Sequence, residues 1–183
     1  IRRQRVDWQR EASVAFATHR TAEGLAAYHE HGDIRFSESG EGARGEIVRD
    51  YLEDRDQRPD GTRVAMAHRR VDVRAINEAI RSELQERGEL ARVTEADELA
   101  GYREGPGREG PGLALTFQTN DGKRDFATGD RIVFLENSRD LGVKNGMLAT
   151  VDHVEPGRII ATLDGRGDSV SVPMGDYQAI DHG

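Results

Sequence analysis

The chain has 183 residues, a formal charge of −8, a hydrophobic fraction of 36% and no cysteine. This length allows one ordinary domain or two small ones, and the composition is sufficient for a packed core. The lack of cysteine excludes a disulfide scaffold, a thiolate zinc site and a cysteine nucleophile. No run approaches the roughly 20 apolar residues of a membrane-spanning helix. We therefore expect a cytoplasmic protein without a membrane span.

The first sixty residues favour helices. Apolar residues recur at near-helical spacing within residues 1–31, with a break near Thr21. Residues 33–36 alternate polar and apolar, as a short strand would. A second apolar helix face lies within residues 47–52, and the sequence Arg-Pro-Asp-Gly at 58–61 predicts a turn after it.

An α/β pattern comes next. Residues 63–67 form a short apolar run, which is typical of a buried parallel strand. Four apolar residues then follow at spacings of 3, 4 and 4, namely Val73, Ile76, Ile80 and Leu84. They share one helix face, and Gly88 is suited to end that helix. A helix, a strand and a helix in succession predict an α/β domain.

The character of the chain changes after residue 100. The sequence Arg-Glu-Gly-Pro-Gly at 103–107 is repeated at 108–112, so we expect a mobile loop over residues 101–112. Beyond it, turn signals such as Asn120-Asp121-Gly122 separate short apolar runs. These runs are residues 113–117, 131–135, 147–154, 158–163 and 169–172. Five short strands in about sixty residues predict a small all-β barrel.

The sequence predicts no ATPase site of its own. A phosphate-binding P-loop needs a glycine-rich turn that ends in Gly-Lys-Ser/Thr, whereas Gly122-Lys123 lies in a hairpin turn and precedes arginine. The acidic pair Asp97-Glu98 follows no apolar strand, so it does not predict a magnesium site. No pair of histidines has zinc-ligand spacing. We expect no metal site in this chain.

Three basic segments are candidate binding sites, each with a simpler interpretation. Arg2-Arg3-Gln4 precedes the first helix, where a guanidinium can reach a phosphate, or it is a solvated basic surface. His68, Arg69 and Arg70 follow the expected strand at the edge where open α/β sheets bind ligands, or they form a charged loop. The glycine-rich turn 141–146 carries Lys144, or it is a structural hairpin.

Several of these motifs together resemble the helicase part of TraA-type conjugative relaxases. The resemblance rests on Gly-Asp-Arg-Ile-Val-Phe-Leu at 129–135, the turn 141–146, and the closing residues 176–183. The opening residues 2–10 resemble the fourth helicase motif of that family, and residues 63–84 resemble the strand and helix that follow it, with Asn77 at the expected place. The tandem repeat departs from the pattern.

The resemblance implies a fold and an organisation. The expected fold class is α/β: part of a RecA-like (P-loop NTPase-type) domain of a RecD-like superfamily-1 helicase, with an inserted SH3-like barrel. Residues 1–118 would be part of the second RecA-like domain, 119–174 the barrel and 175–183 the return to the RecA-like domain. The first RecA-like domain and the DNA-nicking relaxase domain would lie elsewhere in the same bacterial polypeptide.

The resemblance also implies roles for individual residues. Arg3 matches the arginine that senses the γ-phosphate of ATP, so it is the predicted catalytic and nucleotide-binding residue. His68, Arg69 and Lys144 are the predicted contacts to single-stranded DNA. ATP and Mg²⁺ would serve the parent protein only, and the fragment alone would be inactive. Two other interpretations stay open: an autonomous SH3-like module that binds protein or nucleic acid, and a structural fragment without a ligand.

Overall fold

The computed structural model describes residues 5–59, 61–93 and 113–183. Arg3 and the expected loop at 101–112 lie outside these ranges. The chain divides into two units, residues 1–46 and residues 47–183, and each is described by itself.

The first unit contains the helix pair predicted for residues 1–31. These helices are α1 (Asp7–Ala17) and α2 (Thr21–Glu30), and Trp8 fixes their packing. Its ring stacks on His31 with centroids 3.9 Å apart and meets the edge of Tyr28 at 5.0 Å. The expected strand at 33–36 is wrong, because this segment pairs with no strand among the described residues and Phe36 is 82% exposed.

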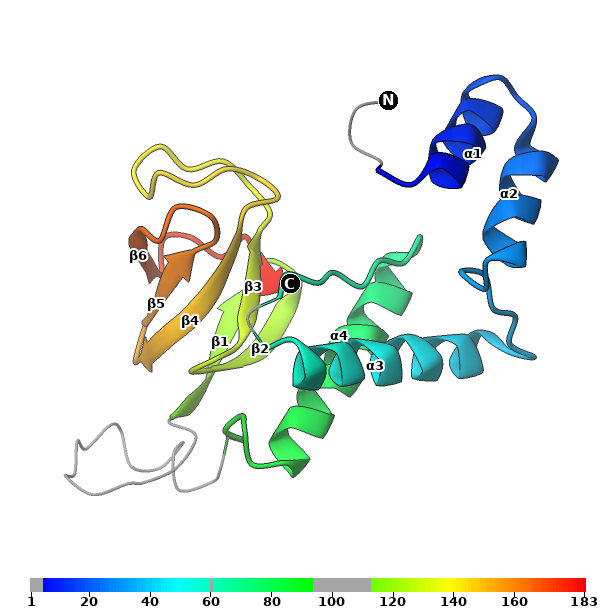
Figure 1. The fold of residues 1–183 in the computed structure, drawn as a ribbon. Helices are drawn as coiled ribbons and strands as arrows, with labels where there is room; N and C mark the ends of the chain where they lie inside the picture. Colours follow the sequence, from blue (N-terminus) through cyan, green and yellow to red (C-terminus); the bar gives the residue numbers. More distant parts are fainter. Residues whose placement is uncertain (1–4, 60, 94–112) are drawn as a thin grey trace. The chain divides into compact units, whose positions relative to one another are not determined.

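The two long helices predicted next are confirmed. They are α3 (Gly40–Gln57), which begins in the first unit, and α4 (Arg70–Glu86) (Figure 1). Leu52 of α3 is buried together with Ile76 and Ile80 of α4, so the apolar spacing in the sequence marks the packed faces. Gly88 has a φ of +73°, a left-handed conformation that favours glycine after a helix.

Residues 63–67 do not form the expected strand. The segment is extended but has no hydrogen-bonded neighbouring strand among the described residues. Ala65 and Ala67 pack against the α3–α4 cluster, whereas Val64 and Met66 are 70% and 78% exposed. The prediction of a buried parallel strand fails because a strand needs partners on its edges, and the described part of the chain supplies none there.

Residues 113–183, which we call the β-region, contain all the described strands. Five match the expected runs, while β2 and β7 were not predicted because their sequences are polar or very short. The strands are β1 (Ala114–Thr119), β2 (Gly122–Ala127), β3 (Arg131–Phe134), β4 (Leu148–Glu155), β5 (Arg158–Leu163), β6 (Ser169–Pro173) and β7 (Ile180–His182).

The strands form two antiparallel sheets rather than a closed barrel. β1 and β2 make a hairpin, and the other five strands are ordered β6-β5-β4-β3-β7 (Figure 1). Phe117 and Phe126 of the hairpin join Ile132, Phe134 and Ile159 of the larger sheet in one core. The hairpin covers the sheet through side chains, and β6 and β7 are the outer strands of the sheet. The fold is therefore mixed helix and sheet, and the expected SH3-like barrel is not confirmed.

Candidate nucleic-acid interface

The predicted DNA-binding residues His68 and Arg69 lie directly before α4, and both are exposed. The Arg69 guanidinium donates to the carboxylate of Asp72 at 2.8 and 3.1 Å. These hydrogen bonds, and then the charge of Asp72, raise the pKa of Arg69. Asp72 also lies in the first turn of α4, where the helix dipole favours a negative charge. Arg69 thus supports the start of the helix, and a phosphate would have to compete with Asp72 for it.

The segment before His68 is held in place by ion pairs. Arg63 donates to the Asp54 carboxylate at 2.9 Å, and Arg58 donates to the same carboxylate at 2.8 Å. The hydrogen bond from Arg63, followed by that from Arg58, lowers the pKa of Asp54. The extended segment 62–67 therefore leaves α3 at a defined place, with Val64 and Met66 facing away from the helices.

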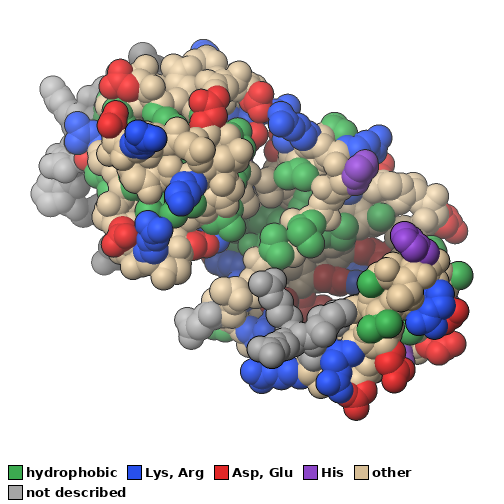
Figure 2. All heavy atoms as spheres, turned by 90° about the horizontal axis from the view of Figure 1, so that it is seen from above, with side chains coloured by type: hydrophobic (Ala, Val, Ile, Leu, Met, Phe, Trp, Pro, Cys, Tyr) green, Lys and Arg blue, Asp and Glu red, His purple; other side chains and the backbone are tan. Residues whose placement is uncertain are grey.

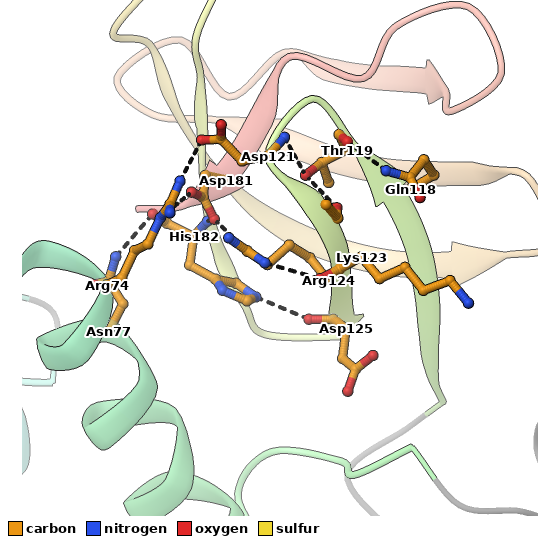
Figure 3. Close-up of polar contacts among 11 residues, drawn as sticks. Arg74, Asn77, Gln118, Thr119, Asp121, Lys123, Arg124, Asp125, Asp181 and His182 are labelled. Carbon is orange, nitrogen blue, oxygen red and sulfur yellow. Dashed lines mark hydrogen bonds and ion pairs between the residues drawn. The ribbon is translucent and has the colours of Figure 1, made fainter. Parts of the chain in front are cut away.

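Helix α4 has a second, polar face that contacts the β-region. Arg74, Asn77 and Arg81 lie at positions i, i+3 and i+7, so they share this face. Arg74 pairs with Asp121 at the hairpin tip at 2.6 Å and with Asp181 of β7 at 3.7 Å. Figure 3 shows that Asn77 donates to the backbone carbonyl of His182, at 2.9 Å.

The third member of this face makes the most enclosed ion pair. Arg81 donates through Nε and Nη2 to the two oxygens of Asp130, at 2.7 and 2.8 Å. Asp130 is 3% exposed, and it also accepts the backbone N–H of Ala127 at 2.8 Å. The resemblance singled out Asn77, whereas the roles of Arg74 and Arg81 were not predicted from the sequence. The i, i+3, i+7 spacing of these polar residues is the sequence pattern from which a shared polar helix face could have been predicted.

His182 lies at the same junction. Its Nε2 donates to the Asp125 carbonyl at 2.9 Å (Figure 3). Its ring centroid lies 4.8 Å from that of Phe126. Burial, followed by the positive charge of Arg81, lowers the pKa of His182. The imidazole is therefore a neutral hydrogen-bond donor that joins β7 to β2.

Lys144 lies in the loop between β3 and β4, residues 135–147, which we call the basic loop. Lys144 is exposed, and its backbone N–H contacts the Met147 sulfur at 3.0 Å. Arg139 and Val143 lie beside it and help to line a shallow hollow. Lys144 thus lies between β3 and β4, whereas His68 and Arg69 lie directly before α4, so the three predicted residues come from two different parts of the fold.

Other cations of the β-region are neutralised by neighbours. Arg124 pairs with Asp181 at 3.2 Å, and Arg131 donates to Asp164 at 3.0 Å. On the face shown in Figure 2, basic side chains are interspersed with acidic ones, and no continuous basic surface is visible among the described residues there. Together with the net charge of −8, this arrangement favours local rather than extended contact with phosphates.

Within residues 5–59, 61–93 and 113–183, no group of three or more His, Asp or Glu side chains is placed to hold a metal ion. None of the helices described there has the length and apolar character needed to cross a membrane.

Comparison with known proteins shows relatives over the full chain. No family model matches the sequence. The conjugal transfer protein TraA of Agrobacterium fabrum is 36% identical over 187 residues, which include 100% of this chain and 15% of that protein. A probable TraA of Sinorhizobium fredii is 34% identical over 185 residues, with the same coverage. The chain is a relative of the TraA conjugal transfer proteins. It spans about 15% of the length of these TraA relatives.

Two solved structures of a Bacteroides Pif1 helicase have a low similarity to this chain. A double mutant of the Pif1 helicase from Bacteroides is 18% identical, with a TM-score of 0.38 over 75% of this chain and 31% of that one. Bacteroides Pif1 bound to single-stranded DNA is 16% identical, with a TM-score of 0.35 over 69% of this TraA-related chain and 28% of that one.

Proposed function

We propose that this chain is part of the ATP-dependent helicase region of a conjugal transfer protein, which moves along single-stranded DNA. The observation that carries the proposal is the 34–36% identity to TraA proteins over the entire chain. In this proposal residues 1–118 are part of the second RecA-like domain, 119–174 are the insertion, and 175–183 return to the RecA-like domain. The parent is a cytoplasmic helicase fused to a relaxase.

The extended segment 62–67 supports the idea of an incomplete α/β domain. One side packs on α3 and α4 through Ala65 and Ala67, while Val64 and Met66 are exposed on the other. An apolar extended segment with unpaired edges is a surface that proteins cover. Strands from other parts of the parent polypeptide would supply that cover.

Each proposed site residue has a separate role in nucleotide or DNA binding. Arg3 reaches the γ-phosphate of ATP and stabilises the charge that develops in phosphoryl transfer. His68 and Arg69 contact the DNA backbone, and for Arg69 this requires exchange of the Asp72 carboxylate for a phosphate. Lys144 contacts the backbone from the β-region. ATP and Mg²⁺ bind only in the complete parent, so the isolated chain hydrolyses no ATP.

The test uses the full-length parent and the isolated chain side by side. We expect DNA-stimulated ATP hydrolysis by the parent only. Arg3→Ala should slow turnover by on the order of 10³-fold, with little change in nucleotide affinity, because the contact strengthens in the transition state. The matched control is Arg5→Ala, which removes a nearby exposed arginine. A parent without DNA-stimulated hydrolysis, or an Arg3 variant with normal turnover, would contradict the proposal.

A second candidate is an autonomous binding module for protein or nucleic acid. The observation in its favour is that the β-region has its own buried core, which includes Phe126, Phe134 and Ile159. Under this alternative, the parent would show no ATPase activity, and a chain of residues 113–183 would retain all of the binding activity.

A further inference from the structure

Two exposed cations of the β-region lie in one loop and line the same hollow. Of the seven lysines and arginines in this region, Arg124 and Arg131 are held by Asp181 and Asp164, and Arg158 and Arg166 are exposed at the start of β5 and in the turn after it. Lys123 points away from the junction with α4 (Figure 3). The other two, Arg139 and Lys144, lie in the basic loop, are exposed, and have no carboxylate partner among the described residues.

The basic loop is held by hydrogen bonds of its own. Ser138 and Val143 exchange two backbone hydrogen bonds of 3.0 Å each. The Asn145 N–H donates to the Asn137 side-chain oxygen at 2.9 Å, and the Gly146 N–H donates to the Phe134 carbonyl at 2.7 Å. These contacts fix the backbone that carries Arg139 and Lys144 on either side of the turn. Little backbone entropy is lost when a ligand binds such a preorganised loop.

The loop is also anchored to the core of the β-region. Val143 is 2% exposed, and Leu141 packs against the same core. The Tyr177 hydroxyl donates to the Glu136 carbonyl at 2.7 Å, which ties the beginning of the loop to the segment before β7. Gly142 has a φ of +68°, so the turn between the two cations needs the left-handed region that glycine adopts readily.

The surroundings of the two cations define the ligand chemistry. The shallow hollow between them is lined by Asn137, Ser138, Arg139, Gly142, Val143 and Lys144. This lining has two positive charges and small polar groups but no aromatic ring, so it offers no stacking platform for a base. Asp140 lies next to Arg139 in the sequence and is exposed, so its charge opposes the binding of an anion.

We propose that the basic loop is a phosphate-binding site for the backbone of single-stranded nucleic acid, with Arg139 and Lys144 as the paired ligands. The inference rests on the proposed function and assigns one site within it. Arg139 is the new member, and Asn137 and Tyr177 are positioning residues, since they hold the loop through its backbone. Binding here is electrostatic and indifferent to base sequence, because only phosphate is contacted.

The experiment measures binding of a fluorescent oligothymidylate of about 12 nucleotides to the whole chain by anisotropy. Titrations run between about 50 and 200 mM salt, and the slope of log K against log salt is compared among variants. Lys144→Ala and Arg139→Ala should each weaken binding and make the slope shallower by about 0.7, the value for one contact to a single strand. The double variant should lose about twice as much.

Two further variants make the test specific. Asp140→Asn should tighten binding, because it removes an opposing charge without adding a cation. Arg158→Ala removes an exposed arginine at the start of β5, at the other end of β4 from the basic loop, and should leave binding unchanged. Normal binding by the Arg139 and Lys144 variants, or an equal loss with Arg158→Ala, overturns the site. The assay contains no ATP, so its outcome is independent of whether the parent is a motor.

Discussion

The β-region and the α3–α4 pair differ in how completely each buries its apolar residues. In the β-region the large apolar side chains Phe126, Phe134 and Ile159 are fully buried. Around α3 and α4, by contrast, Val64 and Met66 are mostly exposed although the same segment contributes Ala65 and Ala67 to a packed cluster. The β-region therefore has a fully buried core. The α3–α4 region has one packed apolar side and one apolar side that is exposed to solvent.

The difference shows what kind of contact each region needs. Most strands of the β-region pair with the next strand along the chain, and β7 returns to pair with β3, so all the partners of this sheet lie within the region. A strand between two helices takes its neighbours from distant parts of the chain. The face beside Met66 is therefore an apolar surface without a hydrogen-bonded strand among the described residues, and the proposed function assigns its cover to other parts of the parent protein.

The largest expected loss of stability comes from a substitution in the buried core of the β-region. Phe126→Ala should lower the free energy of unfolding by about 3–5 kcal/mol, because a fully buried aromatic side chain is lost. Met66→Ser in the isolated chain should change it by less than about 0.5 kcal/mol, since Met66 is already in solvent. Urea unfolding monitored by circular dichroism measures both. Equal losses would show that the two faces are equally buried in solution.

The next prediction addresses the junction between the two regions. Arg81→Ala leaves the Asp130 carboxylate, 3% exposed, without its charged partner, and should cost about 3–5 kcal/mol. The matched control is Arg87→Ala just after the end of α4, where Arg87 bridges the more exposed carboxylates Asp56 and Glu83. Exposed ion pairs are worth about 0–1 kcal/mol. Denaturant melts of both variants that shift by the same amount would contradict a special role for the buried pair.

Periodicity predicted the elements that are specified locally. The apolar positions 73, 76, 80 and 84 identified α4, and the turn signals separated five of the seven strands of the β-region. The missed strands show the limit of this signal. β2 lacks an apolar run, since Lys123 faces solvent and Arg124 pairs with Asp181. β7 has only three residues, which is too short for a clear pattern. Their place in the sheet depends on partners that the pattern of one segment does not reveal.

The candidate site was predicted to a smaller extent. The exposed lysine turn was found from its glycines, and Lys144 does lie in a loop at the surface. The predicted strand at 63–67 failed because a strand requires hydrogen-bonded neighbours, and no described strand pairs with this segment. The roles of Arg74 and Arg81 were missed because charged residues on a helix are usually solvated, and only the fold brings Asp121, Asp130 and Asp181 to them.

The smallest expected effect concerns the dependence of the junction on pH. Because burial lowers the pKa of His182, the unfolded chain binds a proton at this residue at a higher pH than the folded chain does. The stabilising effect of the neutral imidazole is complete above about pH 6.5, the ordinary value for histidine. It decreases as the pH falls from there towards the lowered pKa of the folded state.

The unfolding free energy should therefore fall with pH below about 6.5, with a contribution from His182 of at most about 1.4 kcal/mol per pH unit, the slope for one proton. His182→Gln retains a side-chain donor for the Asp125 carbonyl but has no proton to gain, so its curve should be flatter than that of the wild type in this range. Urea titrations at half-unit intervals from about pH 7.5 to about pH 5, which bracket the ordinary histidine pKa, would measure the difference. Parallel curves would mean that the imidazole at the junction is as accessible to protons in the folded chain as in the unfolded one, and that its contact with the Asp125 carbonyl of β2 opens readily.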